Sequence, residues 1–311
     1  MNATASIPQD FRDALPRVKG RIAFDAPLAR FTWFCVGGPA DVLFRPADAD
    51  DLAAFMAALP DNVPVWPLGV GSNVIIRDGG VRGVVVLLRT GFTDVDADDD
   101  VVVAGAGALA ANVARRGADA GLGGLEFLSG VPGSVGGAVR MNAGAYGGEV
   151  KEVLVSAEVV TRDGEVLRLD ADELGFAYRH SDLSADDIVV RAAFRGVEDD
   201  PAVVHQRLLD VQAKREGSQP LRSRTGGSTF RNPEGGKAWE LIDAAGCRGM
   251  QVGGAQVSEK HCNFLIALDG ATAADIEALG QAVHTAVKQK SGVDLHWEIK
   301  RVGLPLPEGS A

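Results

Sequence analysis

Three polar side chains, far apart along the chain, are of types that can bind an anionic group or take part in proton transfer. Arg179 lies in the segment YRHS, Ser228 in the glycine loop GGSTFRNP, and Glu298 in the C-terminal segment HWEIK. Arginine offers a planar, permanently charged donor fork for a carboxylate, and hydroxyl and carboxyl groups can hand on protons. Taken singly, each also has an ordinary interpretation: an ion-paired surface arginine, a turn serine and a solvated carboxylate at a strand edge.

Glycine is unusually frequent, with 39 residues in a chain of 311, against an average usage of about 7%. The glycines cluster at 69–83, 105–107, 121–148 and 226–254. Glycine adopts positive φ and lets the backbone approach a ligand closely. The clusters therefore predict main chain wrapped around a cofactor.

Two of these clusters could hold phosphate groups. The segment GVGSN at 69–73 follows an apolar run, and such a turn can aim successive N–H groups at a pyrophosphate, although an ordinary loop is an equally open interpretation. The block SGVPGSVGGAVRMNAGAYGGE at 129–149 sets glycines among small residues, which favours a cradle for a flat or phosphorylated ligand over a packed core.

A third cluster imitates a Rossmann fingerprint. The segment VVVAGAGALA at 101–110 has the strand–glycine–helix pattern, and Glu126 lies near the expected position of a ribose-binding acid. Because the flanking sequence lacks regular βαβ repetition, we interpret the segment as a tight strand-to-helix turn.

Composition excludes several classes of protein. With 31 Lys and Arg against 42 Asp and Glu, the net charge is -11, so we expect no nucleic-acid or membrane binding, and an anionic ligand must meet local cations or backbone N–H groups. No apolar run approaches the ~20 residues of a membrane helix, and no secretory signal is visible. Three cysteines without CxxC spacing and five scattered histidines predict reduced thiols, no metal site and a cytoplasmic location.

Periodicity and capping residues predict a mixture of strands and helices. The expected strands are 40–45, 63–68, 84–88, 101–104, 153–161, 165–169, 188–194, 263–268 and 295–302. The expected helices are one after the cap Asp48, then 109–120, 203–215, 238–245 and 272–290, the last ending at Gly292.

Taken together, the motifs resemble those of the UDP-N-acetylenolpyruvoylglucosamine reductase family. GVGSN, the 129–149 block, YRHS, GGSTFRNP, GGAQVSEKH and HWEIK occur in the family's order over roughly residues 30–303. The resemblance implies an α+β fold, in which an FAD-binding domain of the vanillyl-alcohol-oxidase type, in two lobes, precedes a C-terminal α+β substrate-binding domain. The expected parts are an N-terminal arm at 1–30, the FAD domain at 31–200 (lobes of about 31–90 and 91–200), the substrate domain at 201–303 and a tail at 304–311.

The resemblance also implies the site residues. FAD would be bound non-covalently by Gly69, Gly71, Ser72, Asn73, Gly133, Ser134, Gly136, Gly137, Asn142, Gly144, Ala145, Tyr146 and Val189. Arg179 would hold the substrate carboxylate, Glu298 would be its partner acid and Ser228 the proton donor. Arg215 and Asn232 match substrate-binding positions, whereas Arg248 and His261 stand where relatives carry a Lys and a Gln. The stretch from Ser181 to Ile188 is too short for the tyrosine-bearing loop of some members, which indicates the subclass without that loop.

The implied reaction is the FAD-mediated, NADPH-dependent reduction of UDP-N-acetylglucosamine enolpyruvate to UDP-N-acetylmuramate in peptidoglycan precursor synthesis. Its intermediate is an anion that needs electrostatic stabilisation, so we expect a raised pKa for Glu298 that lets it donate a hydrogen bond. Two alternatives remain: another FAD-dependent oxidoreductase of the same superfamily acting on an alcohol or hydroxy acid, and a catalytically silent nucleotide-sugar-binding protein. We expect a monomer.

Overall fold

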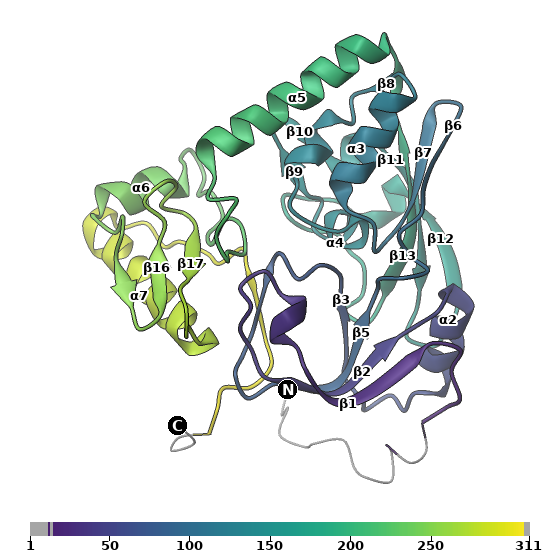
Figure 1. The fold of residues 1–311 in the computed structure, drawn as a ribbon, viewed down its shortest axis with the longest axis horizontal. Helices are drawn as coiled ribbons and strands as arrows, with labels where there is room; N and C mark the ends of the chain where they lie inside the picture. Colours follow the sequence, from purple (N-terminus) through teal and green to yellow (C-terminus); the bar gives the residue numbers. More distant parts are fainter. Residues whose placement is uncertain (1–11, 13–14, 308–311) are drawn as a thin grey trace.

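The computed structural model describes Arg12 and residues 15–307. Figure 1 shows a larger body, which holds the two main sheets, and a smaller C-terminal lobe beside it; the long helix α5 (Pro201–Ser218) leads from one to the other. The architecture is α+β, as expected from the resemblance. Most expected helices and strands are present, with ends shifted by one to three residues.

The first lobe of the body is built on a four-stranded sheet. Its helix α2 (Ala49–Ala58) begins at Asp48, whose side chain accepts a hydrogen bond from the Asp51 backbone N–H at 2.8 Å, and it buries Leu52, Phe55 and Met56. The N-terminal strand of this sheet was not expected, because the segment had been assigned to an arm. In spatial order the strands are β1 (Arg21–Pro27), β2 (Pro39–Arg45), β5 (Val81–Leu87) and β3 (Val65–Leu68).

The second lobe is built on a five-stranded antiparallel sheet. Gly105 ends one of its strands and helix α3 (Ala110–Asp119) follows, but every pairing in the sheet is antiparallel, so no Rossmann unit is present. A Cβ on Gly105 would lie 2.4 Å from the Phe92 carbonyl oxygen, and one on Gly107 would lie 2.8 Å from that of Leu88. These glycines therefore serve backbone packing, as the tight-turn interpretation predicted. In spatial order the strands are β12 (Val166–Asp170), β11 (Leu154–Val160), β13 (Ile188–Arg195), β7 (Val101–Gly105) and β6 (Val95–Asp98).

The C-terminal lobe has its own apolar core under helix α7 (Ala273–Ser291). This helix begins at Thr272, ends at the left-handed Gly292, and buries Ile276, Leu279, Val283 and Val287. The expected strand at 295–302 is wrong over most of its length, because only β18 (Lys300–Val302) is a strand, and it pairs with β4 (Val74–Ile76) of the first lobe. The other regular elements of the lobe are α6 (Ala238–Ala244), β15 (Gln251–Val252), β16 (Ala255–Val257) and β17 (Leu265–Ala267).

Helix α5 packs on the body through Val204 and Leu208, which belong to the main core. The domain boundary expected near residue 200 remains a prediction, although this packing favours placing it at the C-terminal end of α5. The loop-rich block around 129–149 contains the short helix α4 (Val135–Arg140), which was not expected. The remaining short elements are β8 (Leu122–Gly123), β9 (Gly144–Ala145), β10 (Gly148–Glu149), β14 (Val197–Glu198) and the 3₁₀ turns η1 (Ala29–Phe31), η2 (Glu126–Gly130), η3 (Val150–Glu152) and η4 (Ala171–Leu174). Within the described residues, no helix is both long and apolar enough to cross a membrane.

Candidate active site

Arg179 and Glu298, which lie 119 residues apart in the sequence, form an ion pair between the body and the C-terminal lobe. The Arg179 Nε donates a hydrogen bond to Glu298 Oε1 at 3.1 Å, and each side chain is only 18% exposed. Ser228 is the neighbour of Thr229, whose carbonyl oxygen accepts a hydrogen bond from the Glu298 backbone N–H at 2.8 Å. The structure thus brings all three predicted catalytic residues to one place.

The backbone around Arg179 is shaped to hold its guanidinium. Arg179 has a φ of +55°, inside a tight turn closed by reciprocal backbone hydrogen bonds between Ala177 and His180. Its Nη2 donates to the Gly144 carbonyl oxygen at 2.9 Å, and its Nη1 lies 3.5 Å from that of Asn142. A left-handed conformation is costly for a residue with a side chain and tends to persist at functional sites. Since arginine has five N–H donors, two of them remain for an anionic ligand.

Burial and charge act on Glu298 in opposite directions. Burial raises its pKa above the ordinary value, whereas the positive charges of Arg179 and Arg231 lower it, and burial dominates. The expected raised pKa of Glu298 therefore agrees in direction with its surroundings. A protonated Glu298 can donate a hydrogen bond next to a substrate anion.

Arg231 is a second cation near Glu298 that the sequence analysis did not assign. Its backbone N–H donates to the His296 carbonyl oxygen at 2.8 Å, and Phe230 and Trp297 form an antiparallel bridge. Side chains alternate between the two faces of paired extended segments, so Arg231 and Glu298 lie on the same face of this pair. The Nε of Arg231 is buried, with no hydrogen-bond partner among the described residues. The signal was available, because Arg231 lies three residues after Ser228 in GGSTFRNP.

The two predicted phosphate loops, 69–73 and 133–137, lie against each other. A Cβ on Gly69 would lie 2.1 Å from Ser134 Oγ, and one on Gly133 would lie 3.4 Å from Ser72 Oγ. In the described part of the chain, the backbone N–H groups of residues 69–73, Ser134 and Gly137 donate no hydrogen bond. Rows of free N–H groups form anion-binding concavities, and added side chains would fill this one. The loops therefore fit the pyrophosphate of a dinucleotide such as FAD.

The other predicted cofactor residues continue from these loops toward Arg179. Val189 is buried, and its carbonyl oxygen lies 3.5 Å from the position of a Cβ on Gly136. Gly144 and Ala145 form the short strand β9, whose carbonyl holds Arg179, and Tyr146 is 40% exposed with a φ of +51°. Gly71 has a φ of +67°, and a Cβ there would lie 2.2 Å from the Phe31 carbonyl oxygen.

The side chain of Asn142 makes its hydrogen bonds to other residues of the protein. Its side chain is fully buried, donates to Glu149 Oε2 at 2.9 Å and to the Ala177 carbonyl oxygen at 3.1 Å, and accepts from the Lys151 backbone N–H at 2.9 Å. All of these contacts hold the loop that presents the Asn142 carbonyl to Arg179. Its contact with the cofactor remains a prediction, and the structure gives the side chain a positioning role.

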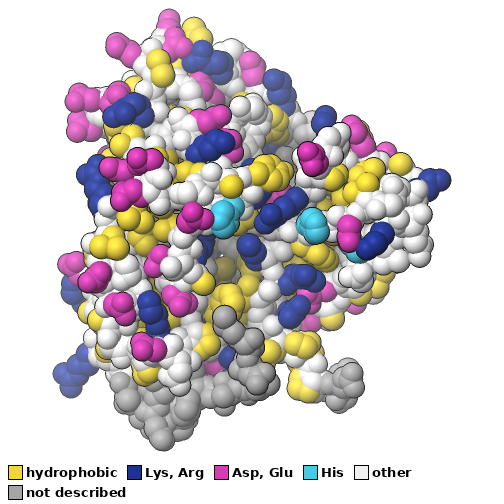
Figure 2. Space-filling view, turned by 180° about the vertical axis from the view of Figure 1, so that it is seen from behind, with side chains coloured by type: hydrophobic (Ala, Val, Ile, Leu, Met, Phe, Trp, Pro, Cys, Tyr) yellow, Lys and Arg dark blue, Asp and Glu magenta, His cyan; other side chains and the backbone are white. Residues whose placement is uncertain are grey.

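A pocket of about 220 Å³ reaches Gly227, the neighbour of Ser228. Residues of the body and of the C-terminal lobe both line it. Arg215 lines it, and burial lowers the pKa of that guanidinium. His261 stacks edge-on against Phe264, a lining residue, with ring centroids 4.8 Å apart, and burial lowers its pKa. Figure 2 shows Lys and Arg side chains gathered around the junction between the C-terminal lobe and the body. The other residues that line the pocket are Trp33, Pro132, Gln219, Pro220, Leu221, Ser223, Thr225 and Gly227.

The two remaining substrate candidates are engaged within the C-terminal lobe. The Asn232 side-chain oxygen accepts a hydrogen bond from the Ala238 backbone N–H at 3.0 Å, so Asn232 holds the start of helix α6. The Arg248 Nε donates to Asp243 at 2.8 Å, and its Nη1 donates to the Glu259 carbonyl oxygen. Neither residue lines the pocket, and their contacts with a substrate remain predictions.

Free amides in two glycine loops, next to a partly buried arginine–glutamate pair, define a flavin-dependent reductase that acts on an anionic substrate. A family model described as "FAD binding domain" matches residues 40–170, and one described as "UDP-N-acetylenolpyruvoylglucosamine reductase, C-terminal domain" matches residues 219–302. The chain belongs to the UDP-N-acetylenolpyruvoylglucosamine reductase family.

Relatives and a solved structure support this assignment. The UDP-N-acetylenolpyruvoylglucosamine reductase of Acidiphilium cryptum is 60% identical, over 97% of each chain, and that of Gluconobacter oxydans is 57% identical, over 92% of this chain and 94% of the relative. The crystal structure of the enzyme from Thermus caldophilus has a TM-score of 0.79 and 34% identity, and the match covers 92% of this chain and all of that one.

Proposed function

We propose that Arg179, Glu298 and Ser228 are the catalytic group of an NADPH-dependent, FAD-mediated reduction of UDP-N-acetylglucosamine enolpyruvate to UDP-N-acetylmuramate. This step belongs to the synthesis of peptidoglycan precursors. The observation that carries the assignment of residues is the 3.1 Å contact between Arg179 and Glu298, which joins the two parts of the chain beside Ser228. FAD held by the two glycine loops, 69–73 and 133–137, would supply the transfer of hydride from NADPH to the methylene carbon of the enolpyruvyl group.

Arg179 binds and orients the carboxylate of the substrate. Its guanidinium is fixed by two backbone carbonyls and by Glu298, so little side-chain entropy is lost when a carboxylate docks on the free N–H groups. As negative charge spreads from the adjacent carbon into the carboxylate, this contact strengthens. Interactions that strengthen in the transition state are the ones that raise the rate.

Glu298 supports the same carboxylate as a hydrogen-bond donor. A charged Glu298 would repel the developing anion, whereas its burial favours the protonated acid. The acid proton then points at an oxygen whose negative charge grows during the reaction.

Ser228 gives its proton to the carbon that becomes the stereocentre of the lactyl ether. A serine hydroxyl is a weak acid, and it can protonate this centre because the carbanion is strongly basic. Ser228 is partly buried in the loop whose Thr229 carbonyl holds the Glu298 backbone. The hydrogen bond from Glu298 to Thr229 therefore fixes the position of the proton donor Ser228 relative to the acid Glu298.

The nucleotide part of the substrate has cations nearby. Arg215 lines the 220 Å³ pocket together with Gln219 and is the candidate for the diphosphate. A superfamily member that oxidises an alcohol or a hydroxy acid forms no substrate carbanion that must be protonated, so it would need neither the Ser228 proton donor nor Glu298 as a supporting acid. That alternative is not favoured.

Anaerobic stopped-flow absorbance of the FAD-loaded protein tests the proposal. NADPH should bleach the flavin, and UDP-N-acetylglucosamine enolpyruvate should then restore its colour. Ser228→Ala should keep the first step and lose the second. A variant that restores the colour at the normal rate would remove Ser228 from the mechanism.

Location and oligomeric state complete the proposal. We place the enzyme in the cytoplasm as a monomer, since its cysteines are free thiols and the Arg179, Glu298 and Ser228 side chains all come from one chain. Light scattering at working concentration measures the oligomeric state. A molecular mass of twice the chain mass would contradict the proposed monomer.

A further inference from the structure

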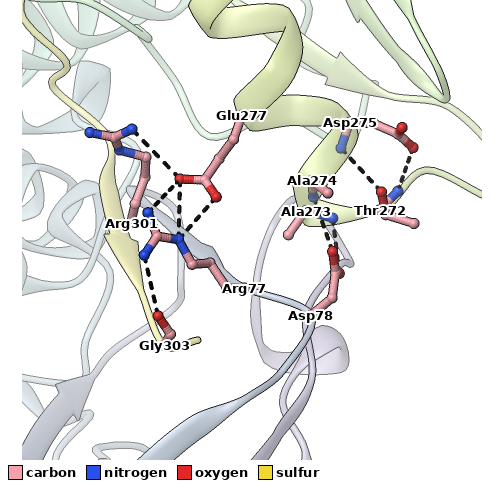
Figure 3. Close-up of polar contacts among 9 residues, drawn as sticks. All are labelled: Arg77, Asp78, Thr272, Ala273, Ala274, Asp275, Glu277, Arg301 and Gly303. Carbon is pink, nitrogen blue, oxygen red and sulfur yellow. Dashed lines mark hydrogen bonds and ion pairs between the residues drawn. The ribbon is translucent and has the colours of Figure 1, made fainter. Parts of the chain in front are cut away.

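A polar network that does not include the catalytic residues links the first lobe to helix α7 of the C-terminal lobe (Figure 3). Arg77, directly after β4, donates to Glu277 of α7 through Nε and Nη2, each at 3.0 Å, and its Nη1 lies 3.4 Å from the Gly303 carbonyl oxygen. Arg301 lies 3.6 Å from the same carboxylate. The Arg77 and Glu277 side chains are 33% and 20% exposed. A forked, half-buried pair of this kind has a defined geometry, unlike a typical surface ion pair.

Asp78 fixes the beginning of α7 from across the interface. Its two carboxylate oxygens accept hydrogen bonds from the backbone N–H groups of Ala273 and Ala274, each at 3.0 Å (Figure 3). The side-chain hydroxyl of the helix's own cap, Thr272, accepts from the Asp275 backbone N–H. The first N–H groups of a helix have no partner within it, and an anion there is favourable. The first lobe therefore supplies part of the cap of a helix in the other lobe.

The chain after the catalytic acid lies tightly against the same part of the first lobe. A Cβ on Gly79 would lie 2.3 Å from the Pro305 carbonyl oxygen, and one on Gly303, which has a φ of +92°, would lie 2.4 Å from that of Gly80. Backbone hydrogen bonds run from Arg77 N–H to the Val302 carbonyl oxygen and from Gly79 N–H to that of Leu304, both at 2.8 Å. The contact leaves no room for the two lobes to slide at this point.

The anchored end of α7 leads directly to the catalytic residues. One turn after Glu277, a Cβ on Gly280 would lie 2.1 Å from the Trp297 ring, so helix and indole are in close contact. Trp297 precedes Glu298, and its ring centroid lies 5.2 Å from that of Phe230, two residues after Ser228. Trp297, which contacts α7, and Phe230, which packs against Trp297, therefore anchor the two segments that carry Glu298 and Ser228.

The cofactor loop lies at the other end of the strand pair formed by β4 and β18. The Lys300 backbone N–H donates to the Asn73 carbonyl oxygen at 3.1 Å, and the Asn73 amide lies 3.4 Å from the Glu298 carbonyl oxygen. Strand β4 joins Asn73 to Arg77, and β18 begins two residues after Glu298. The contacts of Arg77 and Asp78 with α7 therefore connect, through β4 and β18, to the cofactor loop at Asn73 and to the catalytic acid Glu298.

We propose that Arg77, Asp78 and Glu277 are positioning residues that set the place of Glu298 and Ser228 relative to the flavin. This inference rests on the proposed function and assigns a role to residues outside its catalytic group. Reduction of FAD by NADPH needs only the cofactor and a bound nicotinamide. Reduction of the UDP-sugar also needs Glu298 and Ser228 in place, so the network matters chiefly for this second half-reaction.

The test compares both half-reactions in FAD-loaded Glu277→Gln and Asp78→Ala proteins by anaerobic stopped flow. We expect reoxidation of the reduced flavin by the UDP-sugar to slow about 10- to 100-fold, the range that small misplacements of catalytic groups cause. The rate of flavin reduction by NADPH should change less than about twofold in the same experiment. Arg77→Lys should retain more of the second rate than Arg77→Ala, because it keeps the charge and loses only the fork.

Asp100→Asn is the matched control, since it removes an ion pair with Arg195 that is exposed and lies within the body. It should leave both rates unchanged. Normal reoxidation in Glu277→Gln and Asp78→Ala would overturn the inference, and so would an equal loss in both half-reactions. If Asp78→Ala does not fold, the nearly isosteric Glu277→Gln decides alone. If the unmodified protein does not reoxidise with the UDP-sugar, the proposed function fails, and not this inference.

Discussion

Replacing Glu298 by glutamine and by alanine separates the two properties that the account assigns to this side chain. Glutamine keeps a neutral hydrogen-bond donor, and its oxygen can still accept from Arg179 Nε, which lies 3.1 Å from Oε1. Alanine removes both contacts. Glutamine also cannot titrate, so it imitates the protonated acid at every pH.

The expected magnitudes follow from these contacts. Removing one donor to a developing oxyanion costs roughly 10²–10³ in rate, about 2.7–4 kcal/mol, and we expect Glu298→Ala to fall in this range. Glu298→Gln keeps that donor, so its loss should be about tenfold or less, which corresponds to ~1.4 kcal/mol. The rate to measure is reoxidation of the reduced flavin by the UDP-sugar, with flavin reduction by NADPH as the internal control.

The pH dependence follows from the direction of the pKa shift. Burial raises the pKa of Glu298, so the active acid form persists to higher pH than in a free glutamate and is lost as pH rises through the raised value. The reoxidation rate of the unmodified enzyme should therefore fall on the alkaline side of that pKa, whereas Glu298→Gln should lack this fall. A glutamine variant as slow as the alanine variant, or a rate that rises with pH, would refute the role of the protonated acid.

Three further predictions concern the donor, the cofactor loop and the second cation. Ser228→Ala should slow reoxidation by roughly 10²–10⁴ while flavin reduction by NADPH continues, which stopped flow measures, and equal losses in both steps would contradict it. Gly69→Ala places a Cβ 2.1 Å from a serine hydroxyl and should weaken FAD retention on gel filtration. Gly217→Ala, in an open position of helix α5, should instead leave FAD bound and stabilise the fold by about 0.5–1 kcal/mol in a thermal melt. Arg231→Gln removes a cation that lowers the pKa of Glu298 and should shift the alkaline limb of the reoxidation profile to higher pH; a shift to lower pH would show that the two groups do not interact as described.

Features that depend on nearby residues were predictable from the sequence. Helix α7 was expected from about Thr272 to a stop at Gly292, and α2 after the cap Asp48, and the structure has both helices there. These signals act within one turn of the helix, so a single sequence carries them. The grouping of Arg179, Glu298 and Ser228 was also predicted, but through family motifs, because Arg179 and Glu298 have no local signal that joins them, and their catalytic roles remain a proposal.

Features that depend on distant pairing were not predictable. Strand β4 pairs with β18, more than 200 residues later, and no local pattern in either segment predicts the register of this pairing. As a consequence the length of the last strand was overestimated and the contact of Arg77 with Glu277 was not foreseen. The motif around Asn232 also did not reveal that its side-chain oxygen holds the start of α6, and the contact of Asn232 with the substrate remains a prediction.

The account rests on one arrangement: the anionic end of the substrate lies between Arg179 and Glu298, with the Ser228 hydroxyl facing the carbon to be protonated. A crystal structure of the FAD-loaded enzyme with UDP-N-acetylglucosamine enolpyruvate measures it directly. We predict that the substrate carboxylate lies within hydrogen-bond distance of both Arg179 and Glu298, and that the enolpyruvyl group lies between the flavin ring and Ser228. A carboxylate bound elsewhere, or Ser228 turned away from the enolpyruvyl group, would contradict the account.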